Sequence, residues 1–242
     1  MNTLKVLIAV LFVSGAAYAA EPVQTPAISD FASYPLTVCV VSGEALDAGA
    51  VSVMHEGREI TFCCKSCVGD FKKEPAAFVE KLDAMIIETQ LPIYPLDTCP
   101  VSGEALGSMG DPINQVTGNR LVRLCCSGCK TKLAANPAAF IAKLDQAAIA
   151  AQAESYTATV CPISGAALGS MGDAYDYVHA GRLVRFCCAG CIDKFEADPA
   201  AAFATLASTN TDETTDAASE GKSPETGAKS AHDVHESHDH RH

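Results

Sequence analysis

Three copies of one cysteine pattern are the feature that most constrains how this chain can fold. Each copy reads C-x-[VI]-S-G-x-A-L, then a variable segment, then C-C-x-x-C. Self-similarity at a nearly fixed period predicts tandem structural modules. The period is set by the lead cysteines Cys39, Cys99 and Cys161, which lie 60 and then 62 positions apart. All twelve cysteines of the chain fall into three quartets, which are Cys39, Cys63, Cys64 and Cys67; Cys99, Cys125, Cys126 and Cys129; and Cys161, Cys187, Cys188 and Cys191.

The middle copy shows the local plan that we expect in all three. Ser102-Gly103 forms a tight turn after the lead cysteine, a knuckle that lets backbone N–H groups face a sulfur atom. Extended runs at 113–116 and 121–124, with a turn between them, predict a β-hairpin. A helix then begins at the cysteine doublet, with Cys129 in its first turn. Asn136 as N-cap and Pro137 as first residue predict a second helix, from 138 to about 148.

A unit of this size has few large side chains for a core. The chain lacks tryptophan, and aromatic residues make up only 6% of it. Below about 70 residues a core rarely supplies more than about 3–5 kcal/mol, so such units usually add disulfides or a structural metal. The core side chains that copy two offers are Leu106, Ile113, Val116, Val122, Leu124, Leu133, Phe140, Ile141 and Leu144.

A metal ion is the first of two crosslinks that fit the pattern. Thiolates at a helix entrance gain from its free N–H groups and dipole. Four thiolates suit tetrahedral Zn(II), and two or three suit Cu(I). Adjacent cysteines project differently, so we expect one of each doublet to be a ligand and the other to be a fourth or exchange ligand. The preferred sets are Cys99, Cys126 and Cys129 with Cys125; Cys39, Cys64 and Cys67 with Cys63; and Cys161, Cys188 and Cys191 with Cys187.

A disulfide framework is the alternative crosslink. An exported chain with an even number of cysteines is typical of a disulfide scaffold, and a C-x-x-C pair can also be a redox couple. The vicinal doublet is poorly suited to bonding with itself. A thioredoxin-like site would need a much larger strand–helix domain, which this sequence does not supply.

At these residues the chain resembles the TRASH and YHS-like metal-binding modules. The TRASH pattern of one cysteine followed by C-x-x-x-C is matched by the lead cysteines and by pairs such as Cys63 and Cys67. The YHS-like pattern is matched by Cys99-Pro100-Val101, by 182–188 and by 195–199. The resemblance implies small treble-clef-like α+β modules, each a β-hairpin plus helices. It also implies roles in sensing, trafficking or resistance to copper, zinc or mercury.

Two departures from the family pattern concern the ligand set. The second knuckle cysteine of many treble clefs is replaced by Ser42, Ser102 or Ser164, so each knuckle supplies one thiolate. The gaps between the lead cysteine and the doublet are 23, 25 and 25 residues, slightly long for TRASH.

Both ends of the chain differ from the repeats. Residues 1–19 predict a signal peptide, because an apolar stretch leads to the A-x-A cleavage pattern at Ala17–Ala19. We therefore expect a secreted, periplasmic protein with no transmembrane segment in its mature form. Between the ends we expect metal-binding modules at 34–86, 94–149 and 156–207. Residues 208–242 are low in complexity, rich in His and acidic residues, and predicted to be disordered.

The tail and the net charge indicate which partners to expect. The five tail histidines are interleaved with carboxylates and predict a weak collector of metal ions. The net charge of −12 argues against nucleic acid as a partner. The five are His232, His235, His238, His240 and His242.

Three further groups of residues recur among the copies. His55 and His179 align near the hairpin turn, where we expect exposed residues. Met109 and Met171 lie in Gly-Ser-Met-Gly turns, and we expect their side chains to pack under the loop. An arginine recurs before each second strand and is expected to pair with a carboxylate or to offset thiolate charge. These arginines are Arg58, Arg120 and Arg182.

The sequence favours a binding function over catalysis. It has no glycine-rich phosphate loop, nucleophile elbow or repeated acid–base pair, so we do not expect an enzyme. The leading hypothesis is an exported heavy-metal-binding protein that sequesters or delivers Cu(I) or Zn(II), about one ion per module. A metal-efflux or metal-delivery protein would be its partner. The alternatives are a protein-interaction module held by structural zinc, and a disulfide-stabilised scaffold or thiol-redox protein.

Overall fold

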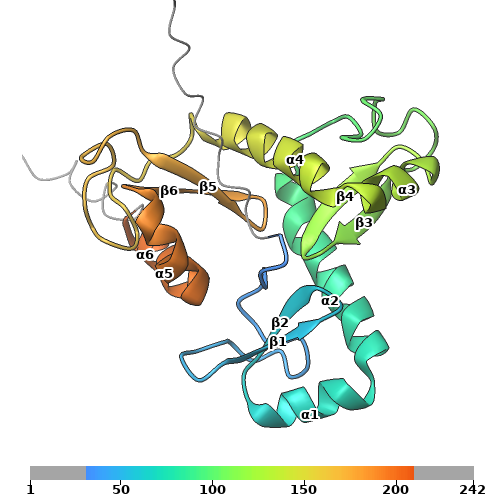
Figure 1. The fold of residues 1–242 in the computed structure, drawn as a ribbon, viewed down its shortest axis with the longest axis horizontal. Helices are drawn as coiled ribbons and strands as arrows, with labels where there is room; N and C mark the ends of the chain where they lie inside the picture. The colour runs from blue at the N-terminus through green and yellow to red at the C-terminus, as the bar shows by residue number, and fades with distance from the viewer. Residues whose placement is uncertain (1–30, 210–242) are drawn as a thin grey trace, which may run out of the picture.

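The computed structural model describes residues 31–209 and contains three hairpin–helix units (Figure 1). The first comprises β1 (Val51–His55), β2 (Arg58–Phe62), α1 (Lys65–Lys73) and α2 (Pro75–Gln90), followed by the short helix η1 (Leu91–Ile93). The second comprises β3 (Ile113–Thr117), β4 (Arg120–Leu124), α3 (Gly128–Ala135) and α4 (Pro137–Gln152). The third comprises β5 (Tyr175–His179), β6 (Arg182–Phe186), η2 (Ala189–Cys191), α5 (Ile192–Ala197) and α6 (Pro199–Thr209). The predicted α+β class and threefold repetition are confirmed.

Each sheet is a two-stranded antiparallel hairpin whose register repeats from module to module. In module 2, Ile113 pairs with Leu124 and Thr117 with Arg120. The turns of modules 1 and 3 place both central residues at positive φ, as at Glu56 (49°) and Gly57 (76°). This backbone matches the right-handed twist of the strands that it joins. The predicted strands in module 2 are therefore correct to within one residue at each end.

The second helix of each module begins at a proline, as the sequence predicts. Proline suits the first helical position because its missing N–H would have no partner there. The expected Asn136 side-chain cap is not formed, whereas Asp198 accepts a hydrogen bond from the backbone N–H of Ala201 at 3.1 Å. Helix α4 continues to Gln152 because the alanine-rich stretch after 147 contains no helix breaker. Within 31–209, no helix is both long and apolar enough to span a bilayer.

Each module buries a small core between its hairpin and its two helices. In module 2, Val122 and Leu124 of β4 pack with Leu133 of α3 and with Ile141 and Leu144 of α4. The lead cysteine and the sulfur cluster form one end of this core. Each core is correspondingly small, as composition predicted.

Val116 is the exception to this packing. It was expected in the core of module 2, but it packs against the core of module 1. The two modules therefore share apolar surface, and β3 and β4 both contact α2.

Consecutive modules are joined by a repeated contact that we call the amide clamp. The Gln90 side chain, at the end of α2, donates to the Asn119 carbonyl at 3.0 Å and accepts from the Leu121 N–H at 2.9 Å. Gln152, at the end of α4, makes the same pair of hydrogen bonds with the Gly181 carbonyl (2.8 Å) and the Leu183 N–H (2.9 Å). One helix end thus holds the next hairpin by its turn.

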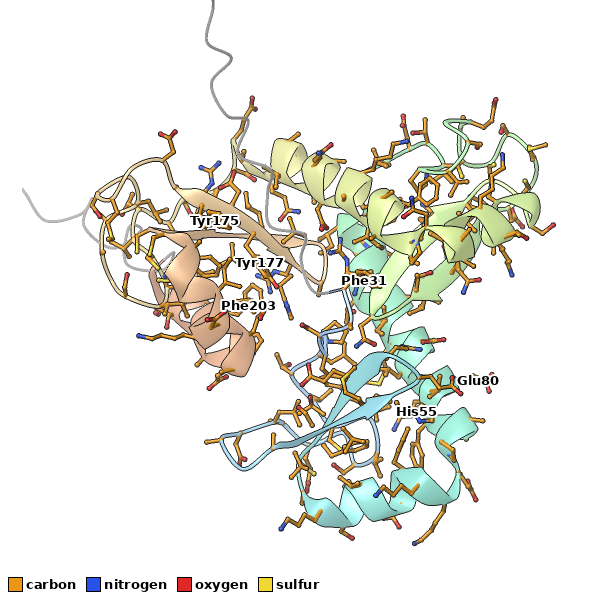
Figure 2. The ribbon with its side chains drawn as sticks, viewed as in Figure 1. Phe31, His55, Glu80, Tyr175, Tyr177 and Phe203 are labelled. Carbon is orange, nitrogen blue, oxygen red and sulfur yellow. The ribbon has the colours of Figure 1, made fainter. Side chains whose placement is uncertain are left out.

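Residues 31–33 lie between the first two hairpins. The Phe31 carbonyl accepts from the Asn119 backbone N–H at 2.7 Å, and Figure 2 shows Phe31 beside this junction. The Asn119 side chain donates to the Ala32 carbonyl at 2.6 Å and accepts from Arg58 Nε at 3.0 Å. Asn119 is 1% exposed. Modules 1 and 2 are therefore fastened by buried hydrogen bonds as well as by apolar packing.

Candidate metal centres

The lead cysteine of each module lies in a tight turn. In module 1 the Cys39 carbonyl accepts from the Gly43 N–H and the Cys39 N–H donates to the Glu44 carbonyl, both at 2.8 Å. Gly43 has φ of 78°, a left-handed conformation that favours glycine. The same hydrogen bonds form around Cys99 and Cys161. The expected knuckle is present in all three modules.

The fold brings three cysteines of each module together. The lead cysteine approaches from the knuckle, the first doublet cysteine from the end of the hairpin, and the last cysteine from the start of the helix. Their sulfur atoms lie within 4.8 Å of one another in every module. The triads are Cys39, Cys63 and Cys67; Cys99, Cys125 and Cys129; and Cys161, Cys187 and Cys191.

The sulfur–sulfur distances fit a shared metal ion. The separation is 3.6 Å between Cys63 and Cys67, and 3.8 Å between Cys125 and Cys129. Tetrahedral zinc with Zn–S bonds of about 2.3 Å places its sulfur ligands about 3.8 Å apart. A disulfide would need sulfur atoms about 2.05 Å apart, and all twelve cysteines are free thiols in the structure. The triads could therefore each hold an ion without large sulfur movements.

The second doublet cysteine lies beside each triad. Cys64 Sγ is 3.7 Å from Cys67 Sγ, and Cys126 Sγ is 3.9 Å from Cys125 Sγ. The sequence favours this second cysteine over the first as a ligand, whereas the structure places the first in the triad. In module 1, Cys64 lies beside the triad because it is the N-cap residue of α1. The backbone N–H groups of Cys67 and Ser66 lower the pKa of the Cys64 thiol.

The thiols of the lead cysteines are buried, yet their pKa values are lower than that of a free cysteine. Burial is the largest single influence on Cys39 and opposes ionisation, but the N–H groups of Ser42 and Cys63 and the Ser42 hydroxyl outweigh it. The result is a pKa lowered to about 7 for Cys39, and to about 6 for Cys99 and Cys161. Hydrogen bonds to the charged form favour it. Near neutral pH, Cys99 and Cys161 are therefore mostly anionic, and Cys39 is ionised in a substantial fraction of the molecules.

The last cysteine of each triad behaves in the opposite way. Burial, together with the neighbouring sulfurs, raises the pKa of Cys67, Cys129 and Cys191 to about 12. Two thiolates held this close repel one another, so the second proton is retained. An ion that binds must displace this proton, which links metal affinity to pH.

A serine hydroxyl contacts the first doublet cysteine in every module. Ser42 Oγ lies 3.3 Å from Cys63 Sγ, and Ser102 and Ser164 lie at the same distance from Cys125 and Cys187. The sequence argument treated these serines only as missing ligands. The structure gives them a role, because a hydroxyl at this distance can orient a sulfur ligand and stabilise its charge.

The prediction that His55 and His179 are exposed turn residues is wrong for His179 and inexact for His55. His179 is 5% exposed, and its ring packs against Phe195 and Phe203. Burial, with the charges of two arginines, lowers its pKa to about 4. His55 is half-buried against Phe71 of α1, and Figure 2 shows it at the end of β1. Both are the last residue of a strand and face a helix instead of solvent.

The expectation for the two methionines is also wrong. Met109 and Met171 are 64% and 68% exposed, so they do not pack under their loops. The glycines on both sides of each methionine have positive φ. This backbone turns the loop outward and leaves the methionine at its tip.

The recurring arginines find different partners. Arg58 pairs with Asp83 at 2.7 Å and Arg120 with Asp145 at 2.8 Å. Module 3 has Ala207 at the matching position, and Arg182 lies over the ring of Phe203, 4.4 Å from its centroid. Of the two expectations, carboxylate pairing is correct in modules 1 and 2.

Some predicted residues lie outside the described part of the chain. These are the signal peptide at 1–19, almost all of the tail, and its metal-collecting histidines His232, His235, His238, His240 and His242. The sequence argument missed Gln90, Gln152 and Glu44. The two glutamines each stand 23 positions after the last cysteine of their module, so alignment of the repeats carried a signal for the clamp.

Comparison with known proteins identifies no relative of this chain. Neither the family models, nor the curated proteins, nor the solved structures give a match to this chain. The resemblance to TRASH and YHS-like modules therefore depends on the sequence motifs alone. What the geometry itself supports is a chain of three repeated modules, each with a cysteine triad that could hold a metal ion.

Proposed function

We propose that this chain is an exported heavy-metal-binding protein that sequesters or delivers thiophilic ions. Each module, treble-clef-like and similar to TRASH and YHS modules, binds one ion through its cysteine triad. The observation that carries this proposal is the threefold recurrence of three sulfur atoms within 4.8 Å of one another.

Cu(I) or Zn(II) is the proposed cargo. Soft thiolate ligands select Cu(I) and zinc over hard cations such as Mg²⁺. Three sulfurs around a buried point suit Cu(I), and recruitment of the second doublet cysteine completes a tetrahedral zinc site.

Export and delivery complete the proposal. The A-x-A pattern at Ala17–Ala19 supports export to the periplasm. The histidine tail supports a first collecting step, and a metal-efflux or metal-delivery protein would receive the ion. We propose no catalytic activity, because a zinc ion with four thiolate ligands has no open position for water.

Metal stoichiometry in triad variants tests this function. The reduced full chain is loaded with Zn(II) or with Cu(I) and examined by native mass spectrometry, with a thiol count on the metal-free form. We expect three tightly held ions, and two in each of the variants Cys39→Ser, Cys99→Ser and Cys161→Ser. Replacement of the five tail histidines by alanine is the control and should leave three. Six disulfides in freshly purified protein with no bound metal would refute the proposal in favour of a disulfide scaffold.

A further inference from the structure

The three cysteine clusters differ in how open they are to solvent. Cys125 and Cys187 are 2% and 3% exposed, whereas Cys63, their counterpart in module 1, is only half-buried. The second doublet cysteine is also more exposed in module 1 than in the other modules: Cys64 is exposed, whereas Cys126 and Cys188 are half-buried. Module 1 therefore presents two of its four sulfurs to the surface.

This difference has a counterpart in the sequence. The segment between the lead cysteine and the doublet is 23 residues long in module 1 and 25 in the other two. Module 1 also lacks the Gly-Ser-Met-Gly loop. Within the C-x-x-C motif, module 1 has Ser66 where modules 2 and 3 have Gly128 and Gly190. The module with the more exposed cysteines is thus also the one whose sequence differs from the other two at several positions.

A carboxylate lies against the open cluster. The Cys63 thiol donates to Glu44 Oε2 at 3.4 Å. Glu104 has the same position in module 2, but in the described part of the chain its carboxylate makes no hydrogen bond to a sulfur. Module 3 has Ala166 there. This hydrogen bond adds a carboxylate contact to the cluster of module 1 that the clusters of modules 2 and 3 lack within the described residues.

From these observations we propose that module 1 is the exchange site of the chain, through which ions enter and leave, while modules 2 and 3 retain theirs. The inference deepens the proposed function and depends on it. On loading, the Cys63 Sγ–H bond breaks, a sulfur–metal bond forms, and the proton passes to water. Exposed Cys64 is the sulfur that an incoming ligand of a partner or chelator reaches first. Ligand exchange at a soft ion proceeds through such an accessible position.

Release kinetics from the full chain test this inference. The chain is loaded with three equivalents of Zn(II) and mixed with excess chromogenic chelator in a stopped-flow instrument. We expect one third of the zinc to leave in a fast phase and two thirds to leave slowly. Cys39→Ser should abolish the fast phase, and Cys99→Ser should keep it and remove half of the slow amplitude. A fast phase that survives Cys39→Ser, or a single rate for all three ions, would overturn the inference.

The role of Glu44 is tested with a matched variant in the next module. Glu44→Ala should change the rate of the fast phase several-fold, because the Cys63 thiol loses its hydrogen bond to the carboxylate. Glu104→Ala should leave all phases unchanged. Equal effects of the two variants would contradict the assignment of Glu44.

Thiol labelling gives a readout that does not depend on metal or on the folding of a variant. The metal-free, reduced wild-type chain is treated briefly with a bulky alkylating reagent and mapped by peptide mass spectrometry. Cys64 should be modified first, and preferential modification of Cys126 or Cys188 would overturn the inference. The two proposals fail in distinguishable ways: a chain that binds no zinc refutes the proposed function, whereas three ions that leave together refute only the exchange site.

Discussion

The hydroxyl of Ser42, Ser102 or Ser164 lies 3.3 Å from the first doublet sulfur of its module, within hydrogen-bond distance. A hydrogen-bond partner in this position can orient a sulfur ligand. The metal affinity of each module should therefore depend on a serine hydroxyl that is not itself a ligand.

Removal of this hydroxyl should weaken the site. In Ser102→Ala we expect zinc affinity at module 2 to fall by about 10–100-fold, the usual effect of losing a hydrogen-bond partner of a metal ligand. Competition with a chelator measures it. Ser108→Ala is the control, since Ser108 Oγ bonds only to the Ala105 carbonyl in an exposed loop. Ser102→Cys should act in the opposite direction by adding a sulfur. An unchanged affinity in Ser102→Ala would show that the serine has no part in the site.

The paired thiol pKa values predict how metal affinity depends on pH. Cys67, Cys129 and Cys191, with pKa values of about 12, are protonated at neutral pH, and each must lose its proton to solvent when an ion binds. Apparent affinity should rise by about tenfold per pH unit for each proton released. The lead thiols also become protonated below about pH 7 in module 1 and below about pH 6 in modules 2 and 3. Metal affinity should therefore fall more steeply with decreasing pH in this range. Calorimetric titration in buffers of different ionisation enthalpy counts the protons. An affinity that stays constant from pH 6 to 9 would contradict these values.

The sequence predicted which cysteines gather in each module better than it predicted the position of each cysteine within the cluster. The spacing was enough to collect the cysteines of each quartet, because a knuckle, a hairpin end and a helix start meet at one point. It was not enough to choose between Cys125 and Cys126, since that choice depends on where the chain bends after Leu124. His179 was misplaced for a similar reason: burial of a strand end depends on the helices that cover it, here through Phe195 and Phe203.

At the scale of elements, one arginine at the start of the second strand fixes the second helix in modules 1 and 2. The Arg120–Asp145 pair is buried, with both side chains 5% exposed, whereas Asp83 of the Arg58–Asp83 pair is 36% exposed. Breaking a buried pair leaves an uncompensated charge, while exposed pairs contribute little. The same contact should therefore matter far more in module 2.

Two matched substitutions test this difference. Asp145→Ala should lower the free energy of unfolding by about 3–5 kcal/mol, because it breaks a buried ion pair. Asp83→Ala should cost about 1 kcal/mol or less. Urea unfolding of the metal-loaded chain, followed by circular dichroism, measures both. Equal losses in the two variants would show that burial does not control the strength of these pairs.

Element boundaries were the part of the fold most accessible from the sequence. Alternating apolar residues and turn residues placed the hairpin of module 2 to within one residue, and Pro75, Pro137 and Pro199 marked the helix starts. The end of α4 was predicted too early because the helix is not stopped locally. It continues to Gln152, where its contacts are with the next module.

At the scale of the whole molecule, the amide clamps turn three small modules into one assembly. Each glutamine satisfies one carbonyl and one N–H of the following hairpin, and Gln90 is itself 4% exposed. The sequence left open whether neighbouring modules pack or move independently. Packing could not be predicted because it depends on contacts between copies, such as Val116 against the core of module 1, that the pattern within a copy does not reveal.

Loss of a clamp should loosen the assembly without removing a module. Gln90→Ala leaves the Asn119 carbonyl and the Leu121 N–H without their partner, which costs about 1–3 kcal/mol for each group that stays buried. We expect a lower unfolding free energy and a larger radius of gyration in small-angle X-ray scattering. Glu88→Ala, an exposed position on the same helix, is the control. A variant as stable and compact as the control would show that the clamp does not hold the modules together.

The coordination shell of a bound ion tests the central claim most directly. X-ray absorption at the zinc edge is recorded on the full chain loaded with three equivalents of Zn(II). Ions held by the cysteine clusters should show a first shell of sulfur, with three or four atoms at about 2.3 Å. A shell dominated by nitrogen or oxygen at about 2.0–2.1 Å would place the metal away from the clusters and contradict the account.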